Sequence, residues 1–270
     1  MSVQAQSVWL GNARQTVRAL MMVCILGTIV MAAWLILGNV LFDTEIGMKD
    51  MLAPSQNPSV FITLSFGALA LMLGSVYLSD TKGIIETEAA GFFDIVGLIC
   101  ARLSMIATAI VVLVMFFEVV SRYVFEKPTL WANELSLWIA GFIFLLAGLY
   151  AMQQRSHIRI FIVYDLMPRW LQKFADIISV VLIWVFTFIL IWGSYNEALS
   201  KFIRWETFGT AWDPPIPATI KPAILIIVSL VAIQALSNLI ADWNKEPEHH
   251  SSADEIDETE IEIIRQSLKD

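Results

Sequence analysis

The chain has 270 residues, of which 57% are hydrophobic and only 16% are charged, and its mean hydropathy is +0.70. Soluble domains carry about a quarter charged residues, so this composition excludes an ordinary soluble domain and indicates a membrane protein. The formal net charge of −8 is concentrated at the C-terminus, because residues 245–270 hold nine acidic and three basic side chains.

Six apolar segments follow one another along the chain. A helix needs about 20 apolar residues to cross a hydrocarbon core about 30 Å thick. Five of the runs contain no Asp, Glu, Lys, Arg or Pro, and they cover residues 19–42, 60–78, 135–152, 177–195 and 223–241. The remaining run, 103–117, has only 15 residues. Because helix-compatible sequence flanks it, we expect one long helix over 92–125 with charged ends.

These runs predict the fold class. Transmembrane β-barrels show alternating segments of about ten residues, and no such alternation occurs in this sequence. We therefore predict an all-α integral membrane helical bundle of about six transmembrane helices, each uninterrupted. Transporters that conduct their own substrate usually combine internal repeats with broken helices, so continuous runs favour a supporting subunit over a pore.

The first run, 19–42, follows Arg14 and Arg18 and has the charge pattern of a secretion signal. Its 24 residues exceed the roughly 7 to 15 of a signal core, and the DTEIG that follows offers no small-residue cleavage site. We expect an uncleaved anchor. Lys and Arg near the helix ends, above all in 155–173, favour a cytoplasmic location for both termini.

A charged junction separates the third and fourth predicted spans. Glu118 and Arg122 are spaced i, i+4 with the acid first, which favours an ion pair on one helical face. A turn at Pro128 would bring Glu134 close enough to be a second acceptor for Arg122, and Trp131 has the ring expected at headgroup depth. Two interpretations stay open. These residues are either the charged and aromatic side chains that are usual where two helices end at the membrane interface, or a docking site for a partner.

Two further charged residues lie in the long third span. Arg102 has a stem long enough to reach the membrane surface, so we expect a snorkelling arginine. Asp94, eight residues earlier, is expected at the water boundary.

The sequence carries no enzyme signature. Haem ligation in membrane cytochromes needs paired histidines within helices, whereas His157 lies in a loop and His249 and His250 lie in the tail. No phosphate-binding loop, nucleophile elbow or zinc-protease motif occurs, and Cys24 and Cys100 sit in apolar runs without disulfide or metal spacing. We expect neither catalysis nor a cofactor.

Several short motifs follow one another along the chain. They are R-Y-x-F from Arg122, W-x-x-E-L from Trp131, HIRI from His157, LMPRW from Leu166, PPIPATIKPA from Pro214, and a last helix containing Gln234. Their order resembles the small membrane subunit, the Q component, of tripartite ATP-independent periplasmic (TRAP) transporters. The similarity covers about residues 92–243 and departs from the family at Phe161, where an Asp is common.

This resemblance implies partners. Family members work with a large membrane subunit that carries the sodium and substrate sites, and with a periplasmic binding protein that delivers an organic acid. The small subunit would be a static scaffold in the bacterial inner membrane, with lipid around it and no nucleic-acid partner. The alternative is a helical membrane anchor or assembly subunit of an unrelated enzyme complex.

The resulting organisation has three parts, an additional transmembrane hairpin (1–91), a four-helix TRAP-like core (92–243) and an acidic cytoplasmic tail (244–270). The outer loops of the core are expected to span 118–134 and 196–221. The residues expected to matter are Glu118, Arg122, Trp131 and Glu134 for the outer hairpin and subunit packing, His157 and Arg159 in the inner loop, and Lys201, Arg204 and Trp205 as a possible contact with the binding protein.

Overall fold

The computed structural model describes residues 7–42, 44–81, 83, 86, 89, 91–155 and 167–243, and within these parts the long elements are helices with no strand among them. Six helices are long and apolar enough to cross a membrane, which confirms the all-α transmembrane prediction. They are α1 (Ala13–Phe42), α2 (Pro58–Ser79), α3 (Phe92–Tyr123), α4 (Ala132–Gln153), α6 (Arg169–Ile203) and α7 (Ile216–Asp242). Two short 3-10 turns, η1 (Asp50–Leu52) and η2 (Pro54–Gln56), lie between α1 and α2.

The helices are longer than the apolar runs that predicted them. The long third span is one continuous helix, as expected, and α6 reaches 35 residues because polar flanks at headgroup depth can continue the helical hydrogen-bond ladder. The prolines of α7 lie outside its apolar run of 223–241. This helix begins before its apolar run, with a proline in its first turn and Pro222 inside it.

Proline is tolerated at the start of a helix, where its missing N–H would have no intrahelical partner anyway. Pro222, farther along α7, removes one ladder hydrogen bond, and such losses are accepted in transmembrane helices when neighbours satisfy the exposed carbonyl. The start of α7 is therefore set by the turn before Ile216 and not by hydropathy.

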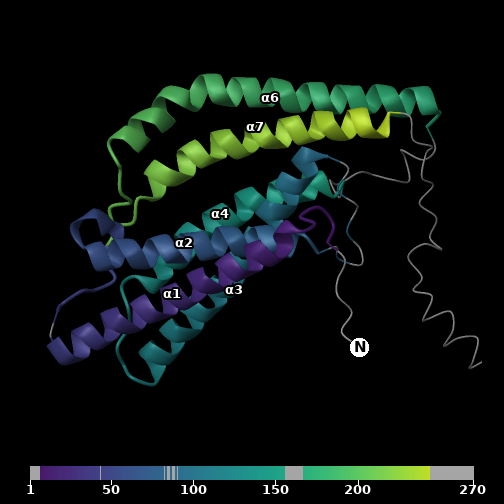
Figure 1. Cartoon of the computed structure of the whole chain (residues 1–270). Coiled ribbons are helices and arrows are strands. Elements are labelled where there is room, and N and C mark those ends of the chain that lie inside the picture. The colour runs from purple at the N-terminus through teal and green to yellow at the C-terminus, as the bar shows by residue number, and fades with distance from the viewer. Residues whose placement is uncertain are drawn as a thin grey trace, which may run out of the picture.

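Ordered by their contacts, the helices follow one another as α1, α2, α3, α4, α7 and α6, and Figure 1 shows α6 and α7 lying together along one side of the molecule. α1 packs chiefly against α2, and α6 packs chiefly against α7, so the arrangement is an open row with two edges. The end of the row that carries the α1–α2, α3–α4 and α6–α7 connections is called the loop end below. The opposite end, where α1 starts and α2, α4 and α7 finish, is called the N-terminal end.

Close approach of small residues holds the row together. A Cβ atom added to Gly97 of α3 would lie 2.9 Å from Cβ of Gln153 on α4, and one added to Gly141 of α4 would lie 2.9 Å from Ile220 of α7. Lipid is as apolar as a leucine side chain, so helices in a bilayer associate through close packing and interhelical hydrogen bonds. Large apolar side chains instead face outward, with Trp192 90% exposed and Phe144 78% exposed.

Candidate packing sites at the two ends of the row

Glu118 organises the α3–α4 connection at the loop end. This side chain is 2% exposed and receives a hydrogen bond of 3.0 Å from Nε of Arg122, one turn later on α3, together with a contact from the second guanidinium nitrogen. The other carboxylate oxygen accepts the backbone N–H of Thr129 at 3.0 Å, and it also accepts the Thr129 hydroxyl. The carboxylate therefore fixes the connecting loop to the end of α3.

Glu134, in the first turn of α4, binds the α6–α7 connection. Its carboxylate accepts the hydroxyl of Thr210 at 2.7 Å and the backbone N–H groups of Trp212 and Asp213 at 3.4 and 3.1 Å. The expectation that Glu134 would accept from Arg122 is wrong. α3 and α7 flank α4 in the row, and Glu134 lies on the α7 side.

Two tryptophans make further contacts between the segments at the loop end. Trp131 stacks on the ring of Phe117, with centroids 5.8 Å apart. Trp212, which the sequence analysis placed only within an outer loop, is 5% exposed and donates its indole N–H to the carbonyl of Met48 at 2.9 Å. This bond joins the α6–α7 connection to the α1–α2 connection across the row.

The residues expected to contact a binding protein lie at the end of α6. The connection there is shorter than expected, because only residues 204–215 separate α6 from α7. Lys201 is still helical and pairs with Glu206, and its hydrogen bond lowers the pKa of the Glu206 carboxyl below the usual range. Arg204 lies 3.7 Å from the same carboxylate with its side chain 68% exposed, and Trp205 is half-exposed.

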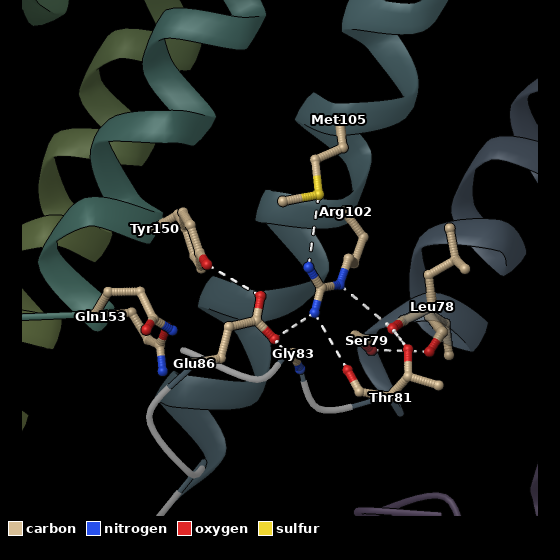
Figure 2. A network of polar contacts seen from close by, with 11 residues as sticks. Leu78, Ser79, Thr81, Gly83, Glu86, Arg102, Met105, Tyr150 and Gln153 are labelled. Atoms are coloured by element: carbon tan, nitrogen blue, oxygen red, sulfur yellow. Dashed lines mark hydrogen bonds and ion pairs between the residues drawn. The ribbon is translucent and has the colours of Figure 1, made fainter. Parts of the chain in front are cut away.

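At the N-terminal end, Arg102 forms an ion pair with Glu86, with Nη2 2.5 Å from Oε2 and side-chain exposures of only 11% and 8%. Figure 2 shows Glu86 between Arg102 and Tyr150, whose hydroxyl donates to the second carboxylate oxygen at 3.0 Å. Arg102 also donates to the carbonyls of Leu78 and Thr81, at 3.3 and 3.2 Å. Carbonyls and a carboxylate at the end of α2 and in the segment after it therefore bind the guanidinium within the protein, and the expectation of a snorkelling arginine did not include these partners.

This network connects α2, α3 and α4. Burial alone would raise the pKa of Glu86, but hydrogen bonds from Arg102, the Gly83 N–H and Tyr150 together lower it. A buried charge is tolerated when it is paired and hydrogen-bonded. Glu86 and Tyr150 were not predicted to matter, since Glu86 lies between the apolar runs of 60–78 and 103–117 and Tyr150 looks like an ordinary interfacial aromatic residue.

Asp80, directly after α2, binds the residues that precede α1. Its Oδ1 atom accepts the Ser7 hydroxyl and the backbone N–H groups of Trp9 and Leu10, at 2.8 to 2.9 Å, and Arg14 lies 3.3 Å from Oδ2. Burial alone would raise the pKa of Asp80, but these donors and the positive charge lower it below its usual value. The two helices of the N-terminal hairpin are thus joined at the end opposite their connecting loop.

Asp94 lies in the first turn of α3, at the N-terminal end of the row, and packs between helices. It is 6% exposed, and it accepts a hydrogen bond of 2.6 Å from Gln234 of α7. The row brings these two positions together across α3 and α7, which no local spacing could indicate. His157, Arg159 and the acidic tail of 244–270 lie outside the described residues.

Comparison with known proteins relates this architecture to transport. Residues 111–245 match the family model described as the DctQ component of tripartite ATP-independent periplasmic transporters. A curated relative, the C4-dicarboxylate TRAP transporter small permease protein DctQ of Vibrio cholerae, is 24% identical over 144 residues, which are 51% of this chain and 52% of that protein. The chain thus matches about half the length of the curated relative. No solved structure matches it.

Proposed function

The chain belongs to the DctQ component family of tripartite ATP-independent periplasmic transporters, and we propose that it is the small permease subunit of such a transporter, acting as a static membrane scaffold. It would partner a large membrane subunit that moves substrate. The transported class would be organic acids, delivered by a periplasmic binding protein and driven by sodium.

One observation carries the scaffold role. The family match covers the second half of α3 and all of α4, α6 and α7, and these helices run without a break across the membrane. Their polar side chains, such as the buried Glu118 and Gln234 and the half-buried Glu134, bind neighbouring helices and loops. A moving element needs bonds that break and reform, whereas these contacts favour one fixed arrangement.

The row also supports a division of the chain. α1 and α2 precede the matched segment, and they pack on one another and, through α2, on α3. We assign residues 1–91 to an additional hairpin, 92–243 to the family-like core and 244–270 to a cytoplasmic tail. The protein would lie in the inner membrane with both termini in the cytoplasm, so that the loop end faces the periplasm.

The loop end would then be available to the binding protein. Lys201 is engaged with Glu206, so the exposed guanidinium of Arg204 beside Trp205 is the more accessible part of this surface. Charge reversal at Arg204 should raise the concentration of binding protein that gives half-maximal transport. Unchanged dependence on that concentration would argue against docking at this position.

Affinity purification of the full chain in mild detergent tests the assignment. We expect a large multi-span permease to co-purify, and we expect the purified chain alone to carry no organic acid into vesicles. Co-purification of a redox or synthase complex would instead support the alternative of a membrane anchor or assembly subunit. Solute transport by the isolated chain would contradict the scaffold role.

A further inference from the structure

Three helices meet at a polar junction near the N-terminal end of the row. Gln234 of α7 donates from Nε2 to Asp94 of α3 at 2.6 Å and to Asn238, one turn later on α7, at 2.9 Å. Asn238 in turn donates from Nδ2 to the backbone carbonyl of Met152 on α4 at 2.7 Å. This chain of hydrogen bonds crosses from α3 through α7 to α4.

Gln153 of α4 borders the same junction. It follows Met152 in the chain, and its side chain packs on Gly97, which lies one turn after Asp94 on α3. Gln153 is 0% exposed and Gln234 is 1% exposed. Both amides are therefore shielded from lipid and from the aqueous phase.

The orientation of the Gln234 amide follows from a backbone group. A carbonyl can only accept, so Asn238 must present its NH₂ group to Met152 and its oxygen to Gln234. Both N–H bonds of Gln234 are then used, and its Oε1 atom has no hydrogen-bond partner among the described residues. Nε2 of Gln153 likewise has none there, while its Oε1 accepts from Gln154 at 2.6 Å.

We propose that a single buried water molecule occupies this α3–α4–α7 junction, where it accepts a hydrogen bond from Nε2 of Gln153 and donates one to Oε1 of Gln234. A buried polar group left without a partner costs about 1–3 kcal/mol, and buried waters characteristically bridge such groups. One donor and one acceptor that lack partners are the complement of one water molecule.

Other occupants fit less well. A metal cation would be repelled by the partly positive N–H of Gln153. A solute or a partner side chain would need an opening to the surface, which exposures of 0% and 1% do not provide. Water can enter from the nearby N-terminal end during local opening, because Gln153 is the last residue of α4. The bridge would make α3, α4 and α7 one packed unit.

A double-mutant cycle on the full chain in detergent tests the bridge. The variants are Gln153→Met, Gln234→Met and the double variant, compared by melting temperature. We expect each single change to lower the melting temperature, and we expect the double variant to lose clearly less than the sum of the two. Additive losses, or a rise in melting temperature for Gln153→Met, would overturn the proposal, since removing a donor that has no partner relieves a penalty.

The matched control is Gln154→Met, which removes the other amide bonded to Gln153 but leaves Nε2 of Gln153 in place. Its effect should add to that of Gln234→Met without coupling. Melting temperatures in sodium, potassium and choline chloride at equal ionic strength should agree. A rise specific to one cation would contradict the proposal and indicate a bound ion in place of water. If Gln234→Met fails to fold, a density map of the natural sequence decides, because a direct Gln153–Gln234 bond without intervening density contradicts the proposal.

Discussion

Nη2 of Arg102 lies 2.5 Å from Oε2 of Glu86, and this ion pair joins the segment after α2 to α3. Tyr150 extends the link to α4 through the other carboxylate oxygen. The pair therefore lies where the proposed hairpin of residues 1–91 adjoins the proposed core of residues 92–243.

Replacing Arg102 by Met should strongly destabilise the protein, because Glu86 would be left as a buried charge without its counterion. Loss of one partner from a buried pair costs about 3–5 kcal/mol, and removing both partners is often far milder. The free energy of unfolding in detergent should therefore recover partly in the Arg102→Met, Glu86→Leu double variant. Arg18→Met is the matched control at an exposed arginine of α1. Equal losses at both arginines would contradict a specific role for the pair.

Acid should release the residues that precede α1 from Asp80. The folded-state pKa of Asp80 is lowered, so its contribution to stability is complete above the usual carboxyl pKa of about 3.9 and is lost as the pH falls through the lower folded value. Asp80→Asn should lower stability at neutral pH and make it less sensitive to acid below about pH 4. Thermal unfolding across pH 2 to 7 checks this, and an unchanged acid profile in the variant would count against the assignment.

Glu134→Ala should loosen the α6–α7 connection while leaving the helices in place. The change removes the acceptor for two backbone N–H groups and one hydroxyl. Amide hydrogen exchange at Trp212 and Asp213 should accelerate by about tenfold or more, as expected for the loss of roughly 1.4 kcal/mol of local protection. Glu126→Gln, at an exposed acid of the α3–α4 connection, should leave exchange at both positions unchanged.

Adding a methyl group at Gly97 should separate α3 from α4. A Cβ atom there would lie 2.9 Å from Cβ of Gln153, and overpacking of this kind costs about 1–3 kcal/mol. Gly148→Ala on α4 is the control, because no neighbouring atom lies within 4 Å of the added group, and glycine replacement within a helix gains about 0.5–1 kcal/mol. Opposite shifts in melting temperature are expected, and a rise for Gly97→Ala would show that the helices can move apart without penalty.

Hydropathy was sufficient to predict the spans, because every helix that crosses a bilayer needs about 20 apolar residues. Local spacing was likewise sufficient to place Glu118 beside Arg122, one turn apart on a single helix. It could not assign the partner of Glu134, since that depends on which helix lies beside α4. The order of the helices in the row is a property of the tertiary structure, because α7 packs against α4 although α6 comes before α7 in the sequence.

The network around Arg102 was missed for a related reason. Glu86 lies 16 residues before Arg102 in a segment without a hydropathy signal, and Tyr150 reaches the same carboxylate from α4. A lone arginine in an apolar helix is compatible with a path to the membrane surface or with a buried acceptor. Only the positions of the neighbouring helices distinguish these two arrangements of the arginine side chain.

The open row has a consequence for how such a chain can change in evolution. In a closed bundle, an inserted helical pair must displace existing neighbours. Here α1 and α2 lie at one edge of the row, and the helix packing at the other edge, of α7 on α4 and of α6 on α7, does not involve them. Gene fusion or loss at the N-terminus could therefore lengthen or shorten the protein by a hairpin without altering the segment of 111–245 that defines its family.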